Sequence, residues 1–149
     1  MTRQIAIVGP SRMHLNALID TMEERGFSTT YHMRADTAIP DFTTGTKYGL
    51  IAIEPYIAPG EYTDPIVDRI MHSTYPEYPL IGAHVIRRTR EPTSINRDTP
   101  IVVMGIIVGD QNRARSLFLE VGATEYVNYT HLRNMNAFYN RLEQLARQK

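Results

Sequence analysis

Short, wholly apolar runs separated by helical patterns constrain the fold of this chain more than any other feature of its sequence. Residues 5–8, 50–53 and 101–104 each consist of four apolar residues, and each run stops at a glycine or a glutamate. Runs of this kind are typical of strands that a parallel sheet buries on both faces. They predict the central strands of a sheet and leave its edges to less apolar segments.

The segments between these runs carry the spacing of amphipathic helices. Ser11 and Asp110 each stand where a helix cap is expected, and Gly26 and Gly122 follow the last turns of the same two helices. Residues 82–91 are predicted to form another helix, which Pro92 ends. The first and last helices each have one apolar face, made of Leu15, Leu18, Ile19 and Met22 and of Leu132, Met135, Phe138, Leu142 and Leu145, respectively.

Three further segments are less regular. Residues 27–33 are rich in β-forming residues but alternate weakly, which favours a second strand near the sheet edge. Residues 35–47 contain Pro40 and a threonine-glycine cluster, so a short or distorted helix is expected there. Residues 125–127 are predicted to form a last short strand.

Five strands that alternate with helices predict an α/β fold with a flavodoxin-like, doubly wound, five-stranded parallel sheet. We expect residues 1–149 to form a single domain, since domains commonly hold roughly 100–200 residues. Ligands of such sheets bind at the carboxyl ends of the strands. The positions to inspect are therefore those that follow Val8, Ile53, Met104 and Val127.

Composition excludes several classes of function. Sixteen basic and sixteen acidic residues give a net charge of zero, which disfavours direct binding of nucleic acid or of anionic lipid. The chain has no cysteine and therefore no thiolate metal site, and no run approaches the roughly 18 apolar residues of a membrane span. Without a signal peptide, the cytoplasm is the expected location. The basic cluster of Arg87, Arg88 and Arg90 is interpreted as a solvated helix face.

Histidine and nucleophile patterns are equally uninformative. The five histidines show no metal-ligand spacing, and each is expected to be an isolated surface or boundary residue; they are His14, His32, His72, His84 and His131. No serine stands in a nucleophile elbow. We therefore expect neither an enzyme nor a bound metal or cofactor.

Three segments, taken in order, resemble a receiver domain of the response regulators of two-component signalling. Residues 48–54, followed by Pro59-Gly60, are similar to the strand and turn that hold the acceptor aspartate of that family. Residues 85–91, followed by residues 99–104, resemble the passage from a helix to the fourth strand, and residues 122–127 (Gly-Ala-Thr-Glu-Tyr-Val) resemble the glycine-alanine-acid-acid-tyrosine signature. The resemblance implies a CheY-like fold and a role in signal transduction.

The residues that carry out chemistry in the family are replaced here. Magnesium is held there by two acidic residues after the first strand, and the matching residues of this chain are Gly9 and Pro10. The acceptor aspartate is matched by Glu54, the following hydroxyl residue by Gly105, and the conserved lysine by Tyr129. An additional methylene at position 54 would move the attacking oxygen by more than about an ångström. This pattern predicts a degenerate pseudo-receiver, which metal-dependent phosphorylation does not control.

Three features allow two interpretations each. Glu54 either mimics a phosphorylated aspartate or is a hydrogen-bonded residue at a strand end. Tyr126, at the position of the family's aromatic switch, either retains that role or is packed at the sheet rim with its hydroxyl in water, and we favour the second interpretation because position 105 has no hydroxyl partner. Ile106, Ile107 and Val108 form either an exposed contact patch with Tyr126 or an extension of the fourth strand.

An inserted segment, residues 61–81, has no counterpart in an ordinary receiver. Its tyrosines and prolines suit a lid over the degenerate pocket, a contact surface for another protein, or a packing element. The predicted function is a regulatory module that binds another signalling protein, or a second copy of itself, through the face of the fourth helix, fifth strand and fifth helix. The alternative is a sensor of a small ligand or anion, bound at the strand ends under the inserted segment.

Overall fold

The computed structural model describes residues 3–60, 80–105, 110–128 and 132–148. Five parallel strands form one sheet in the order β2-β1-β3-β4-β5. They are β1 (Gln4–Val8), β2 (Ser28–His32), β3 (Leu50–Ile53), β4 (Ile101–Gly105) and β5 (Glu125–Asn128). The helical elements are α1 (Arg12–Glu24), α2 (Ala35–Pro40), the π-helical turn η1 (Asp41–Gly45), α4 (Leu80–Thr89), α5 (Gln111–Val121) and α6 (Met135–Ala146).

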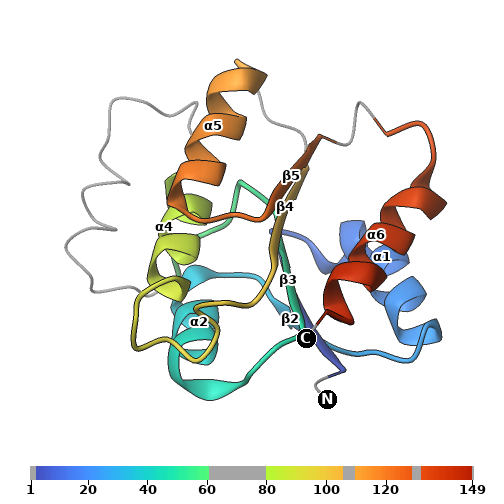
Figure 1. Cartoon of the computed structure of the whole chain (residues 1–149), viewed down its shortest axis with the longest axis horizontal. Coiled ribbons are helices and arrows are strands. Elements are labelled where there is room, and N and C mark those ends of the chain that lie inside the picture. The colour runs from blue at the N-terminus through green and yellow to red at the C-terminus, as the bar shows by residue number, and fades with distance from the viewer. Residues whose placement is uncertain (1–2, 61–79, 106–109, 129–131, 149) are drawn as a thin grey trace.

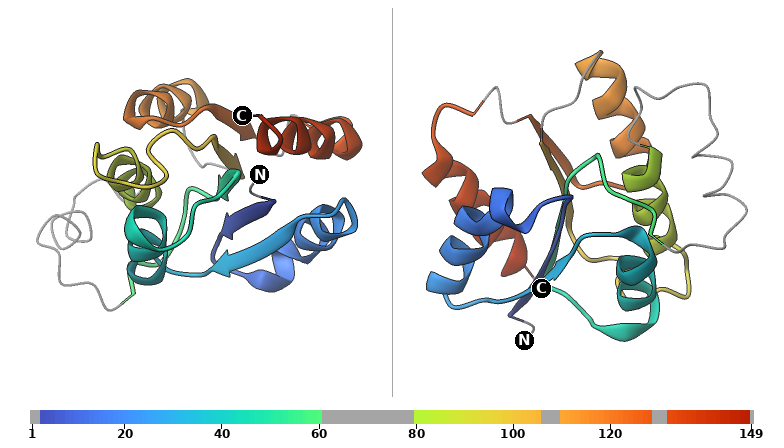
Figure 2. Two further views of the ribbon diagram at one scale, coloured as in Figure 1. Left: turned by 60° about the horizontal axis from the view of Figure 1, so that its bottom comes forward. Right: turned by 180° about the vertical axis from the view of Figure 1, so that it is seen from behind.

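Helices cover both faces of the sheet. Figures 1 and 2 show α1 and α6 together on one face and α2, α4 and α5 on the other. Every strand pairing is parallel, and helical crossovers lead from one strand to the next. The predicted flavodoxin-like, doubly wound sheet is confirmed.

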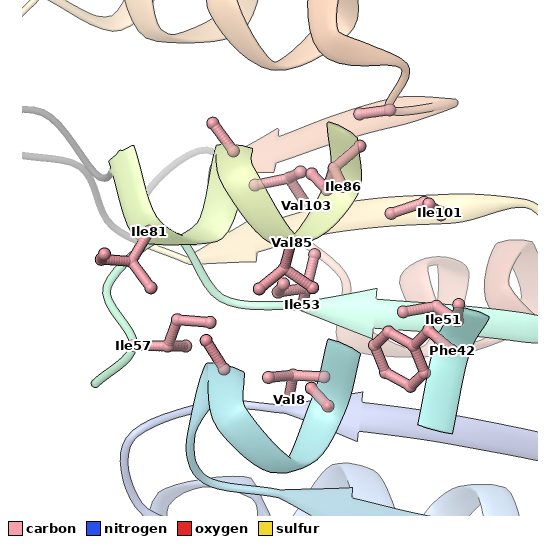
Figure 3. Close-up of a cluster of buried hydrophobic side chains, with 14 of the residues drawn as sticks. Val8, Phe42, Ile51, Ile53, Ile57, Ile81, Val85, Ile86, Ile101 and Val103 are labelled. Atoms are coloured by element: carbon pink, nitrogen blue, oxygen red, sulfur yellow. The ribbon is translucent and has the colours of Figure 1, made fainter. Parts of the chain in front are cut away.

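Alternate side chains of each central strand enter two separate hydrophobic clusters. In β3, Ile51 and Ile53 pack under α2 and α4, whereas Leu50 and Ala52 pack under α1 and α6. Figure 3 shows the first of these clusters, with Phe42 packed beside Ile51. Burying one large aliphatic side chain contributes about 1.5–3 kcal/mol, so the apolar runs that predicted the strands also stabilise them.

The second strand and the helical segment that follows it agree with the predictions for residues 27–33 and 35–47. β2 is an edge strand and is only partly buried. The helix after it is short, with Pro40 as its last residue, and the chain continues as a π-helical turn closed by the hydrogen bond from the Thr46 amide to the Asp41 carbonyl at 2.9 Å. The missing N–H of a proline makes a regular continuation of the helix costly.

The ends of α5 are as predicted, whereas the start of α6 is not. The Asp110 carboxylate accepts hydrogen bonds from the amides of residues 112 and 113, and Gly122 ends α5 with a φ of 118°. The last helix begins only at Met135, because the Asn134 side chain caps it. Leu132 therefore precedes the helix and Met135 is exposed, so the predicted apolar face was too long by one turn.

Arg90 contradicts the interpretation of the basic cluster as a solvated face. Its guanidinium donates hydrogen bonds to the carbonyls of Gly122 at 2.9 Å, Arg97 at 2.8 Å and Asn96 at 3.3 Å. Burial lowers the pKa of this group. Arg90 thus fastens the loop after α4 to the end of α5, whereas Arg87 is exposed as expected.

Among the described residues, none of the helices has both the length and the apolar character required to span a bilayer.

Candidate functional site

The register of the sheet brings the predicted site positions together at its carboxyl edge. Val8 pairs with Ile53, and the Glu54 amide continues this pairing with a hydrogen bond of 2.8 Å to the Val8 carbonyl. Gly105 pairs with Asn128 in the same way, one strand pair further along the sheet. Gly9 and Glu54 therefore follow β1 and β3, and Gly105 is the last residue of β4, at the same edge of the sheet.

The Glu54 side chain occupies the space above Gly9. Only 7% of Glu54 is exposed. A Cβ atom added to Gly9 would lie 3.3 Å from the Glu54 carboxyl group and 2.5 Å from Cδ1 of Leu15. Glycine at position 9 thus makes room for both side chains. The carboxylate of β3 fills the volume into which a side chain after β1 would project.

Tyr31 and Arg12 complete this end of the sheet. The Tyr31 hydroxyl donates a hydrogen bond of 2.6 Å to the carbonyl of Gly9. Burial raises the pKa of Tyr31, the negative charge of Glu54 raises it further, and the positive charge of Arg12 partly offsets both effects. The Tyr31 phenol therefore lies within electrostatic reach of both the Glu54 carboxylate and the Arg12 guanidinium.

The chain that leaves β3 crosses the carboxyl end of β1. The carbonyls of Ala58 and Pro59 accept hydrogen bonds of 2.9 Å and 3.1 Å from the amides of Ala35 and Asp36, at the start of α2. Because β1 lies between β2 and β3, residues 55–60 must pass over its width to reach that point. Residues 55–60 therefore lie over the carboxyl end of β1 and are held there by their hydrogen bonds to α2.

Glycine is required at position 105 by the backbone and by its neighbour. Gly105 has a φ of 148°, a region that L side chains rarely adopt, and an added Cβ would lie 3.0 Å from Cδ of Pro55. On the other side of this proline, a Cβ on Gly82 of α4 would lie 2.7 Å from the Pro55 carbonyl oxygen. Two glycines therefore let Pro55 pack tightly between β4 and α4.

The described residues at this edge do not fit the magnesium ion that the resemblance implies. A magnesium site at the first strand needs carboxylate oxygens there, and Gly9 supplies none. The described part of the chain contains no group of three or more potential ligand side chains close enough to hold a metal. Among the nearest neighbours of position 9, the carboxylate is that of Glu54.

Tyr126 is held by side chains of α5. Its hydroxyl donates a hydrogen bond of 2.8 Å to Oε1 of Gln111, so the interpretation that this hydroxyl lies in water is wrong. The ring stacks on Phe118 with the centroids 6.1 Å apart. Burial raises the pKa of Tyr126, and the nearby Tyr56 adds to the effect. The switch-position tyrosine therefore packs between β5 and α5 with its polar end bound.

Several predicted features lie outside the described residues. They are Tyr129, the Ile106, Ile107 and Val108 run, and the inserted segment up to residue 79. Of that segment, residues 80 and 81 form the first turn of α4, and Ile81 is buried.

A polar cluster at the end of β2 was not predicted. Nε2 of His32 lies 2.8 Å from a carboxylate oxygen of Asp41, and its Nδ1 lies 3.1 Å from the Thr37 hydroxyl. Tyr48 donates a hydrogen bond to the same Asp41 oxygen. His84 is fully buried, so the interpretation as a surface or boundary residue is wrong for it. His32 does lie at the boundary, but its contacts with Asp41 and Thr37 show that it is not isolated. Neither the nine-residue separation from Asp41 nor any motif signals this cluster.

Comparisons with solved structures identify the fold. The chain is similar to a two-component response regulator from Clostridium difficile (22% identity, TM-score 0.70, covering 99% of this chain and 98% of the other). It is also similar to the beryllofluoride-activated receiver domain of Klebsiella pneumoniae RstA (19%, TM-score 0.67, 97% and 99%) and to the beryllofluoride-activated NtrC4 receiver domain dimer (12%, TM-score 0.67, 97% and 96%). The chain has the CheY-like receiver fold.

The receiver fold gives the described elements their counterparts. α5, β5 and α6 correspond to the fourth helix, fifth strand and fifth helix of a receiver, and Figure 1 shows α5 and α6 on either side of β5. No protein-family model and no curated protein sequence matches the chain. The similarity is therefore one of fold, and the chemistry has to be argued from the residues.

Proposed function

We propose that this protein is a pseudo-receiver, a regulatory module that binds a signalling partner without control by phosphorylation. The observation that carries the proposal is the buried Glu54 carboxylate, which fills the space over Gly9. In-line attack on a phosphoryl group needs a reactive carboxylate that is open to the donor and a cation that neutralises the incoming charge. Here the carboxylate is enclosed and its neighbour at position 9 has no side chain.

The neighbourhood of Gly105 also supports the proposal. A hydroxyl residue there would have to adopt an unfavourable backbone conformation and press against Pro55. Tyr126, in turn, has its hydroxyl bound by Gln111. Position 105 therefore has no hydroxyl group that could bind a phosphoryl group, and the Tyr126 hydroxyl already has a hydrogen-bond partner in Gln111.

The interaction surface that we propose is the face formed by α5, β5 and α6. β5 is an edge strand, so one side of its backbone has no neighbour in the sheet. Leu119 of α5 is a large apolar residue that is 38% exposed. The dimer of the NtrC4 receiver domain shows that a receiver fold can pair with a second copy. We therefore propose a signalling protein or a second copy of this chain as the partner, in the cytoplasm.

The alternative, a sensor that holds an anion over the ends of β1 and β3, finds no support in the geometry. An anion there would meet the negative charge of Glu54 in a poorly hydrated environment, where like charges repel strongly. A ligand at those strand ends would first have to displace this side chain.

The phosphorylation test uses acetyl phosphate and beryllofluoride with Mg²⁺ and a phosphorylatable receiver domain as positive control. We expect no phosphoryl mass shift and no Mg²⁺-dependent change in tyrosine fluorescence of this protein. A stable phosphoryl adduct on Glu54, located by peptide mass spectrometry, would refute the proposal.

The interaction test compares two exposed apolar residues. Leu119→Glu lies on the proposed face, whereas the control Ile95→Glu lies in the loop before β4 and has the same exposure of 38%. We expect Leu119→Glu to weaken self-association in sedimentation experiments, or binding of an isolated partner, and Ile95→Glu to leave it unchanged. Equal effects of both variants would contradict the assignment of the face.

A further inference from the structure

A small polar pocket opens between α5 and β5, on the proposed interaction face. Its volume is about 120 Å³, and it is lined by Gln111, Asn112, Arg115, Tyr126 and Asn128. These residues come from the first turns of α5 and from the end of β5. The lining contains one cationic side chain and no acidic one.

Hydrogen bonds inside the pocket fix its polarity. Oε1 of Gln111 accepts two hydrogen bonds, from the Tyr126 hydroxyl at 2.8 Å and from Nδ2 of Asn128 at 2.6 Å. Both lone pairs of that oxygen are therefore engaged with β5. The strongest donor that the lining offers to a ligand is the Arg115 guanidinium, which makes no ion pair with any carboxylate in the described part of the chain.

The backbone amides at the N-terminus of α5 do not supply the donors of this pocket. The Asp110 carboxylate already accepts hydrogen bonds from the amides of Asn112 and Arg113, at 3.0 Å and 3.2 Å. These are the backbone donors that a helix N-terminus would otherwise offer to an anion. The side chain of Arg115 and the amide side chains of the lining are what remains for a ligand.

We propose that this pocket binds a carboxylate group, with Arg115 as the cationic partner. A guanidinium donates two parallel hydrogen bonds to the two oxygens of a carboxylate, a geometry that favours this ligand over a spherical anion. The volume leaves room for a carboxyl group and the carbon that bears it. The inference deepens the proposed function and rests on it, because the pocket lies on the face where we place the partner.

The carboxylate has two possible sources, an acidic side chain of a partner or a free small acid. The first probe is sodium acetate, with neutral acetamide as its control, followed by amide NMR at constant ionic strength. The second is glutamate blocked at both backbone ends, with blocked glutamine as its control. We expect saturable shifts of the amides of residues 111–115 and 126–128 with a carboxylate probe and none with its neutral control.

Matched variants test the role of the guanidinium. We expect Arg115→Gln to weaken binding of the carboxylate probes by about tenfold or more, the effect of losing a charge-assisted pair. Arg113→Gln, an exposed arginine of the same helix outside the lining, should leave binding unchanged. Binding of both probes identifies a side-chain carboxylate as an accepted ligand, and binding of acetate alone identifies a site for free acids.

Absence of saturable binding, or equal losses in both variants, would overturn the pocket assignment. This result would not bear on the lack of phosphorylation, which the acetyl phosphate experiment tests without any ligand on α5. Conversely, a phosphoryl adduct on Glu54 together with acetate binding would refute the proposed function and leave the carboxylate pocket standing.

Discussion

Returning an acidic side chain to position 9 should destabilise this protein, because the space is already filled. A Cβ atom on residue 9 would lie 2.5 Å from Cδ1 of Leu15, far inside the contact distance of two carbon atoms. Leu15 of α1 points into the core, is only 2% exposed and cannot swing into water. Gly9→Asp adds to this collision a second negative charge beside Glu54.

The steric part of this effect is isolated by Gly9→Ala. Overpacking by one methyl group costs about 1–3 kcal/mol, and the lower entropy of the unfolded chain returns roughly 0.4–1 kcal/mol. The φ of Gly9 is not positive, so backbone strain does not contribute. The two ranges leave a net loss of about 0–2.6 kcal/mol. Because a separation of 2.5 Å forces the buried Leu15 to move, we expect the upper part of it, about 1–2.6 kcal/mol, which lowers the Tm by roughly 2–10 °C in a domain of this size.

A double-mutant cycle with Leu15→Ala tests the cause. Leu15→Ala alone should cost about 2–5 kcal/mol, because it leaves a cavity in the core. In that background the methyl group of Gly9→Ala has room, so it should cost nothing further. Urea unfolding followed by circular dichroism measures all four proteins. The reasoning is refuted if Gly9→Ala is neutral in the wild type, or if its cost is the same in both backgrounds.

Three further predictions concern the surroundings of the site. Asn96 is fully buried and its side chain makes hydrogen bonds to two backbone carbonyls and one backbone amide; Asn96→Ala should therefore cost about 3–5 kcal/mol in urea unfolding, and a loss below about 1 kcal/mol would contradict this role. Burial alone would raise the pKa of Asp41, but hydrogen bonds from Tyr48, His32 and Thr46 lower it below its usual 3.8. The stability that this carboxylate contributes is thus present above the unfolded pKa and lost as the pH falls through the folded value, and Tyr48→Phe should flatten the dependence of unfolding free energy on pH below about pH 4. Gly105→Ser should lower the Tm without restoring beryllofluoride binding, since the serine would be strained at positive φ; an unchanged Tm would refute that strain.

The sequence predicted the parts of the fold that depend on local pattern. The run of residues 50–53 marked a buried strand because every position of β3 lies inside one of the two clusters. Asp110 and Gly122 marked the ends of α5 because the hydrogen bonds that they make span only a few residues. The start of α6 was missed although Asn134, a good capping residue, stood in the sequence; the apolar spacing through Leu132 outweighed it.

Contacts between distant segments account for what the sequence could not show. The three carbonyls that hold Arg90 belong to two different loops, one of them 32 residues away. Helical periodicity describes the side of a helix on which a residue lies and not the direction in which a long side chain folds at its end. For the candidate site, the resemblance placed Gly9 and Glu54 at matching positions. That the Glu54 side chain fills the space over Gly9 depends on the register between β1 and β3 and on Leu15.

A receiver can transmit a signal only if the groups between its strand ends and its partner surface have two arrangements of similar free energy. In this structure the groups between the strand ends and the proposed partner surface each make close contacts. Pro55 packs between Gly105 and Gly82, and Tyr126 stacks on Phe118. A ligand at the Arg115 pocket could shift the conformation only by binding a second arrangement with a different affinity from this one. The proposal that phosphorylation does not control this receiver fold therefore predicts that substitution of Glu54 leaves carboxylate binding at the Arg115 pocket unchanged.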